Sequence, residues 1–89
     1  MRPICVKCEV ELRMEQAGIY VAEMFRENKE VYKLWRADLW KCPICKTEIV
    51  HGFGNNPIAE HFDTGVDKRV KLLIEKGEKV VFNKEVKYL

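Results

Sequence analysis

Two short segments, Cys5-Val6-Lys7-Cys8 and Cys42-Pro43-Ile44-Cys45, contain all four cysteines of this 89-residue chain. Two residues separate the cysteines in each segment, a spacing that lets one tight turn present both sulfur atoms to the same point. Four thiolates at the corners of a tetrahedron are a common ligand set of zinc in proteins. We therefore predict that one metal ion is bound by four ligands: Cys5, Cys8, Cys42 and Cys45.

Two other fates are open to these cysteines: they could form disulfides or remain as buried thiols. The N-terminal segment has no apolar stretch typical of a secretion signal, so we expect a cytoplasmic protein whose thiols stay reduced. In that compartment paired cysteines bind metal more often than they form disulfides. Zinc is the ion that we expect, and iron is the alternative.

The composition is that of a small globular protein. Hydrophobic residues make up 47% of the chain and charged residues 34%, which argues against a disordered tail. No apolar run approaches the roughly 20 residues that span a bilayer, so we expect no membrane segment. We predict a single domain over residues 1–89, with a metal-binding β core at 1–52 and a loop, a helix and a final strand at 53–89.

The residues between the two cysteine pairs predict a β-hairpin. Polar and apolar residues alternate over 9–14, which favours a strand with one buried face. Residues 16–18 break this pattern, and β-branched and aromatic residues then favour strands over 19–25 and 31–41. A chain that leaves the first cysteine pair along one strand can therefore return to the second pair along the next.

The register of this hairpin is predicted from charge. A two-residue turn would place Glu27 opposite Glu30, and like charges directly opposite each other are destabilising. We therefore predict a three-residue turn at 28–30, which also makes one face of the hairpin apolar. This register forms three pairs: Glu27 with Val31, Ile19 with Leu39, and Val21 with Ala37.

The C-terminal part predicts one helix among shorter elements. Val66, Val70, Leu73 and Ile74 fall on one helical face. Thr64 and Asp67 resemble a capping box at the start of this helix, and Gly77 is a stop signal. The other predicted elements are a strand at 47–50, a loop at 52–57, a turn of helix from Ile58 to Phe62, and a strand from Val80 to Phe82.

The two cysteine pairs resemble those of the zinc-ribbon and rubredoxin-like class, in which two knuckles at the ends of β-hairpins hold one ion. The resemblance covers roughly residues 4–50, and Pro43 matches the C-P-x-C form common in that class. It implies a small antiparallel β zinc ribbon, so that with the C-terminal helix the predicted fold class is α+β. In many members a glycine follows the second cysteine, where Glu9 and Lys46 stand here. Either these turns tolerate another residue or their geometry differs.

The predicted function follows from the metal. Four thiolates leave zinc no open position for water or substrate, so we expect a structural ion that makes the hairpin a rigid platform for a macromolecule. Strand alternation places Trp35 with the core and Tyr32, Arg36 and Trp40 on the other face. Together with Lys41, these three residues form the candidate partner surface. Aromatic rings beside cations bind single-stranded nucleic acids. The resemblance to zinc ribbons also implies an association with nucleic-acid machinery, so nucleic acid is slightly favoured over protein as the partner. The alternatives are a rubredoxin-like iron electron carrier, which the resemblance implies, and a protein–protein adaptor.

His51 and His61 are the residues best suited to catalysis, and Glu60 and Asp63 lie near them in the sequence. The chain has no serine, which excludes a serine nucleophile. Histidines of this kind are more often surface or hydrogen-bonded loop residues. We therefore predict no enzymatic activity and no small-molecule substrate.

Overall fold

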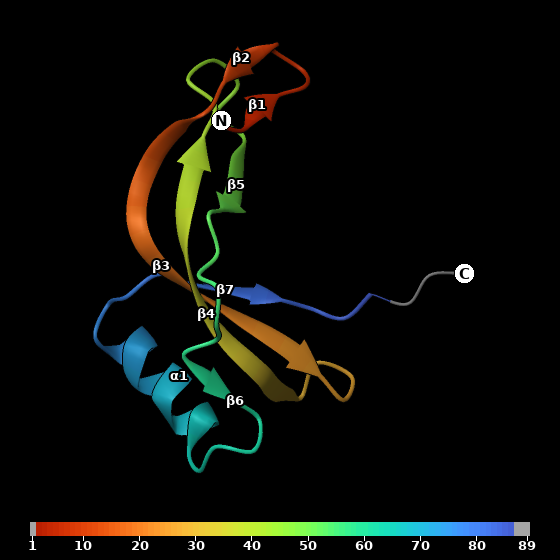
Figure 1. The fold of residues 1–89 in the computed structure, drawn as a ribbon, viewed down its shortest axis with the longest axis vertical. Helices are drawn as coiled ribbons and strands as arrows, with labels where there is room; N and C mark the ends of the chain where they lie inside the picture. The colour runs from red at the N-terminus through yellow and green to blue at the C-terminus, as the bar shows by residue number, and fades with distance from the viewer. Residues whose placement is uncertain (1, 87–89) are drawn as a thin grey trace.

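The computed structural model of this chain describes residues 2–86. A long, bent hairpin of β3 (Arg13–Phe25) and β4 (Glu30–Lys41) runs through the molecule, and shorter elements pack along it (Figure 1). These are β1 (Ile4–Cys5), β2 (Val10–Glu11), β5 (Glu48–His51), β6 (Ala59–Glu60), α1 (Val66–Glu75) and β7 (Val80–Asn83). The described helix is too short and too polar to cross a membrane.

The strands form two sheets. β1 and β2 make a small antiparallel ribbon, and the larger sheet has the order β5-β4-β3-β7, with β6 also paired to β4. All pairings in the larger sheet are antiparallel except that of β3 with β7, which is parallel. The predicted combination of antiparallel strands and one C-terminal helix is confirmed, but the parallel pairing was not anticipated. It arises because α1 carries the chain back along the sheet before β7 begins.

The predicted register of the hairpin is wrong, by two residues over Ile19 to Glu23 and by three next to the turn. Ile19 lies opposite Ala37 and Val21 opposite Trp35, and the turn consists of the four residues 26–29. This longer turn is accessible because its first three residues adopt left-handed backbone conformations, with φ of 52°, 59° and 64°. The prediction was made to keep Glu27 away from Glu30. In the structure, Glu30 instead forms an ion pair with Arg26 at 3.2 Å.

The expected break at residues 16–18 is a bulge inside β3. The register shifts between Gln16 and Ile19, and Gly18 has a φ of 72°. The break between two strands lies earlier in the chain, at Leu12, which separates β2 from β3. Leu12 is 2% exposed. A bulge bends and twists a strand without ending it, which accounts for the strong curvature of β3 (Figure 1).

The helix packs on one face of the hairpin and forms what we call the helix-side core. Its buried residues are Ala22, Val31, Leu34, Ala59, Val66 and Val70. Of the predicted helical face, Val66 and Val70 are buried and Leu73 packs against them, whereas Ile74 is 47% exposed. The helix-side core therefore joins α1 to both strands of the hairpin and to β6.

The two ends of α1 compare differently with prediction. The capping box is wrong: Gly65 is the N-cap residue, with a φ of 82° and no side-chain cap. Asp67 instead accepts a hydrogen bond from the backbone N–H of Val31 at 3.3 Å, so its carboxylate ties α1 to β4. The stop at Gly77 is confirmed, because its N–H donates to Ile74 O and the N–H of Glu78 to Leu73 O, both at 3.0 Å.

The predicted turn of helix from Ile58 to Phe62 is also wrong. Residues Ala59 and Glu60 form β6, which pairs with Leu34 and Lys33 of β4. The backbone N–H of Ile58 donates to Leu34 O at 2.8 Å, and Ala59 is 5% exposed in the helix-side core. Pairing with β4 therefore satisfies backbone groups that an isolated turn of helix would leave open.

Candidate metal centre

The β1–β2 ribbon and the turn between β4 and β5 lie at the same end of the hairpin (Figure 1). These two segments contain the two cysteine pairs. Cys5 is the last residue of β1, and Cys8 follows it in the turn to β2. Cys42 follows directly after the end of β4, and Cys45 lies in the turn that leads to β5. The return of the chain along β4 thus brings the second cysteine pair to the first. This explains how two pairs that are far apart in the sequence can share one site.

The two knuckles are built in the same way. In the first, the N–H of Glu9 donates to Cys5 O at 2.7 Å, and in the second the N–H of Lys46 donates to Cys42 O at 3.1 Å. Glu9 has a φ of 56° and Lys46 a φ of 68°. Both residues thus take the left-handed conformation in which glycine has no steric cost. Of the two expectations for these positions, the structure supports tolerance of a non-glycine residue.

The four sulfur atoms converge on one point. Their Sγ atoms all lie within 4.8 Å of one another, and those of Cys5 and Cys45 are 3.7 Å apart. A tetrahedral zinc site with Zn–S bonds of about 2.3 Å has S–S edges of about 3.8 Å. The cysteines are free, so none is joined to another in a disulfide. This set of donors and distances fits one tetrahedral metal ion held by Cys5, Cys8, Cys42 and Cys45.

Apolar side chains surround the sulfur atoms and form what we call the cysteine-side core. Cys42 is fully buried and Cys5 is 8% exposed, whereas Cys8 and Cys45 are half-buried. Leu12 is the remaining buried member. Val10, Trp40 and Ile49 pack against these residues. The knuckles therefore keep water from one side of the sulfur cluster and expose the other side.

Local hydrogen bonds favour thiolates in the second knuckle. The Thr47 hydroxyl lies 3.0 Å from Cys45 Sγ, and its hydrogen bond lowers the pKa of Cys45 to about 6. Hydrogen bonding from the Cys45 backbone likewise lowers the pKa of Cys42. Burial, together with hydrogen bonds to the other three cysteines, raises the pKa of Cys8 to about 12. A bound cation would supply the positive charge that Cys8 needs to ionise.

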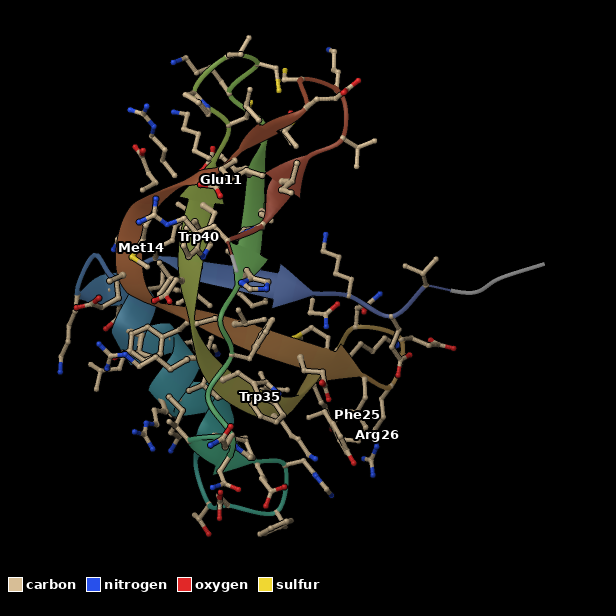
Figure 2. All side chains as sticks on the ribbon, turned by 45° about the horizontal axis from the view of Figure 1, so that its top comes forward. Glu11, Met14, Phe25, Arg26, Trp35 and Trp40 are labelled. Atoms are coloured by element: carbon tan, nitrogen blue, oxygen red, sulfur yellow. The ribbon has the colours of Figure 1, made fainter. Side chains whose placement is uncertain are left out.

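The four residues of the predicted partner surface do not form one patch. Trp40 is half-buried against the sulfur cluster, far from Trp35 and Phe25 at the other end of the hairpin (Figure 2). Lys41 is half-buried beside it, at the last position of β4. Near the middle of β4, Arg36 is exposed, and its guanidinium lies 5.5 Å from the centre of the Tyr20 ring.

Tyr32 belongs to an aromatic cluster beside the hairpin turn. Its ring stacks on His61, with centroids 4.8 Å apart and planes at 12°, and Phe25 contacts both rings. Lys33 Nζ lies 5.2 Å from the Tyr32 centroid and 5.8 Å from that of Trp35. Trp35 itself is half-buried on the sheet. Sequence reasoning missed this cluster because His61 comes from another part of the chain.

The structure does not bring the two candidate catalytic histidines together. His51 packs edge-on against Trp40, on the side of the cysteines, whereas His61 lies beside the hairpin turn. Glu60 pairs with Lys33 at 3.7 Å, and Asp63 accepts a hydrogen bond from the Glu60 backbone at 2.7 Å. Within residues 2–86, the four cysteines are the one group of His, Cys, Asp and Glu side chains arranged to hold a metal ion.

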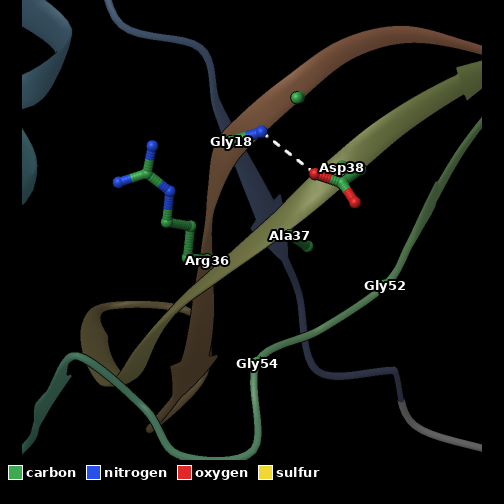
Figure 3. A pocket seen from close by; sticks show the side chains of 7 residues that line it. Gly18, Arg36, Ala37, Asp38, Gly52 and Gly54 are labelled. Carbon is green, nitrogen blue, oxygen red and sulfur yellow. Dashed lines mark hydrogen bonds between the residues drawn. The ribbon is translucent and has the colours of Figure 1, made fainter.

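A polar hollow beside the bulge of β3 was also missed. Asp38 Oδ1 accepts a hydrogen bond from the N–H of Gly18 at 3.0 Å (Figure 3). A Cβ at Gly18 would lie 2.5 Å from Arg36 Nη2, and one at Gly52 would lie 2.8 Å from Asp38 Oδ2. Both glycines also have positive φ, so larger residues would be strained and crowded there. Asp38 thus satisfies a backbone donor that the bulge removes from the strand ladder.

Comparison with known proteins assigns this chain to no family. No family model, curated protein or solved structure matches it.

Proposed function

We propose that this protein is a zinc-binding, non-catalytic module of zinc-ribbon type in which a four-cysteine site holds the end of the β3–β4 hairpin in place. The convergence of four free Sγ atoms within 4.8 Å carries this proposal. A closed shell of four thiolates gives zinc no open coordination position, which suits a structural role. In small zinc domains such a site contributes on the order of 10 kcal/mol to folding.

An iron electron carrier is the second candidate. The left-handed conformation of Glu9 and Lys46 supports it, because the missing glycines no longer argue against knuckles of the rubredoxin type. Zinc is preferred because rubredoxin-like iron sites have aromatic surroundings, whereas Trp40 is the aromatic residue packed against the described sulfur cluster. Phe25, Tyr32 and His61 gather instead beside the hairpin turn.

Metal content and absorption spectra of the purified chain separate these two functions. We expect one zinc per chain by elemental analysis and no visible absorption. One iron per chain, with a red colour that bleaches on reduction, would instead support the electron carrier. A protein that is fully folded without any metal, by near-ultraviolet circular dichroism, would contradict both.

As the partner of this module we propose a single-stranded nucleic acid in preference to a protein. The support is chemical: cations lie over rings at several places on the hairpin, with Arg36 over Tyr20, Lys33 over Tyr32 and Arg26 over Phe25. Bases stack on aromatic rings, and nearby cations attract the phosphates. Arg36 is the most useful residue to test because it is exposed and belongs to no described ion pair.

Fluorescence anisotropy with a labelled oligothymidylate and an oligouridylate tests this partner. We expect binding at low salt that weakens as salt is raised, and a several-fold loss of affinity in Arg36→Ala. Arg13→Ala removes an exposed arginine elsewhere on the hairpin, in β3, and is the matched control. Absence of binding at low salt, or equal losses in both variants, would contradict the proposed surface and leave a protein as the partner.

A further inference from the structure

The outer edge of β7 is available for pairing. β7 pairs with β3 along one edge, and no strand of residues 2–86 pairs with its other edge. In Figure 1, β7 leads away from the body of the molecule beside open space. Its residues Val80, Val81 and Phe82 are apolar, and Phe82 is 42% exposed. An apolar, unpaired strand edge is a template for pairing with another strand.

The sequence around this edge is complementary to itself. When two copies of the segment run antiparallel about Val81, Val81 meets its own counterpart and Val80 meets Phe82. In the same register Glu78 faces Lys84, and twofold symmetry repeats each unlike pair. Opposite charges and apolar residues facing each other across strands both stabilise a pairing.

The neighbouring registers lose these pairs. Shifting the copies by one step toward Phe82 places Lys79 opposite Lys84 and Glu78 opposite Glu85, so like charges meet. Shifting them one step the other way leaves Glu78 opposite Asn83 and Lys84 opposite Gly77, so no charge pair remains within residues 77–84. Of these three registers, the one centred on Val81 therefore has the most favourable charge pairs.

The side chains concerned are accessible. Side chains alternate along a strand, so Val80 and Phe82 share a face of β7. Glu78 and Lys84 lie just outside β7, and the pairing proposed below extends the strand over both. Val80 packs against the helix-side core, which identifies this as the face that carries α1. Glu78 and Lys84 are exposed and form no ion pair within the described part of the chain. Both charges are thus free to pair with a second copy.

Hydrogen bonds hold the backbone of this segment on both sides of β7. The N–H of Tyr20 donates to Lys79 O at 3.0 Å, so alignment with β3 begins before β7 itself. Beyond β7, the Asn28 side chain accepts a hydrogen bond from the Glu85 N–H at 2.6 Å. Anchoring on both sides reduces the ordering that a partner strand would otherwise have to impose.

From these observations we propose that two copies of this chain associate through antiparallel pairing of their β7 edges, centred on Val81. The two sheets then form one continuous sheet across a twofold axis. Glu78 of each copy pairs with Lys84 of the other, and Val80 and Phe82 of the two copies cover each other. The interface is independent of the metal's identity and of any nucleic acid.

Sedimentation equilibrium of the metal-loaded, full-length chain over a range of concentrations tests this interface. A dimer has twice the chain mass of 10.5 kDa. Glu78→Lys and Lys84→Glu each place like charges opposite each other at both ends, and we expect each to raise the dissociation constant roughly ten-fold or more. Lys68→Glu and Glu75→Lys are the matched controls, because they make the same charge changes on the exposed surface of α1.

Variants that restore the pairing of opposite charges make the test specific. The double variant Glu78→Lys/Lys84→Glu exchanges the charges and is expected to dimerise like the original chain. An equimolar mixture of the two single variants is expected to form a heterodimer, since each supplies the charges that the other lacks. A monomeric original chain at millimolar concentration would overturn the proposal. Single variants that dimerise normally, or a mixture that stays monomeric, would overturn it as well.

Discussion

The two ends of the β3–β4 hairpin are stabilised by different means. In the cysteine-side core the buried residues are Cys5, Leu12 and Cys42, two of which are ligands of the candidate metal centre. In the helix-side core six apolar residues are buried, and none is a cysteine. Little apolar area is removed from water at the cysteine end, so we expect its folding to depend on the metal. We expect the helix end, which buries more apolar residues, to hold its own elements together without the metal.

The ends also differ in how they hold strained backbone. Glu9 and Lys46 at one end, and the turn residues Arg26, Glu27 and Asn28 at the other, all have positive φ. The knuckle residues are held by short backbone hydrogen bonds to Cys5 O and Cys42 O. The turn has one backbone hydrogen bond, from the Lys29 N–H to Arg26 O at 3.2 Å. It is held in addition by side chains, through the Arg26–Glu30 ion pair and the hydrogen bonds of Asn28 with the Glu85 backbone. We therefore expect metal binding to hold the strained residues in place at the cysteine end only.

Loss of a metal ligand is expected to give the largest difference between the two ends. Cys42→Ser removes a fully buried ligand, so we expect metal to dissociate and the free energy of unfolding to fall by several kcal/mol. Hydrogen exchange by mass spectrometry should show lost protection over residues 4–12 and 42–51, with α1 affected less.

The control for this prediction is Val6→Ser, which changes a 91% exposed residue within the first knuckle and leaves every ligand in place. It should retain metal and protection. Equal loss of protection along the whole chain in Cys42→Ser would show that the two cores fold as one unit. Retention of metal by that variant would contradict the four-ligand site.

Truncation in the helix-side core is expected to have the next largest effect. Leu34 is fully buried there, and its replacement by alanine should cost about 2–5 kcal/mol of unfolding free energy without releasing the metal. Urea unfolding followed by circular dichroism, together with metal analysis, measures both quantities. Leu72→Ala, at a site that is 49% exposed, should change stability by less than about 0.5 kcal/mol. Metal release by Leu34→Ala would contradict the separation of the two cores.

Relief of backbone strain is expected to give the smallest effect, and in the opposite direction. Glu9→Gly removes the steric cost of a left-handed residue, which we expect to stabilise the metal-bound chain by about 0.5–1 kcal/mol. Glu27→Gly makes the same change in the hairpin turn and should stabilise it by a similar amount. Glu11→Gly, in β2, is the control and should be destabilising. Thermal unfolding distinguishes these outcomes. A loss of stability in Glu9→Gly would contradict the backbone strain that we infer at Glu9.

Several features of this fold could not be read from short-range patterns. A shift of two residues in the hairpin register keeps every side chain on the same face, so alternation alone could not separate the predicted pairing of Ile19 with Leu39 from the observed pairing with Ala37. The turn of helix expected at Ile58 became β6 because β4 offered hydrogen-bond partners. Trp40, predicted on the surface, packs beside sulfur atoms that are brought to it by another segment.

The sequence by itself determined the cysteine knuckles, the helix with its stop at Gly77, and the positions of the main strands, because each of these depends on residues only a few positions apart. Only the tertiary structure decided the register of the hairpin, the parallel pairing of β7 with β3, and the separation of the cysteine-side core from the helix-side core. These features depend on contacts between distant segments, whose free energies are summed over the whole chain and leave no local pattern in the sequence.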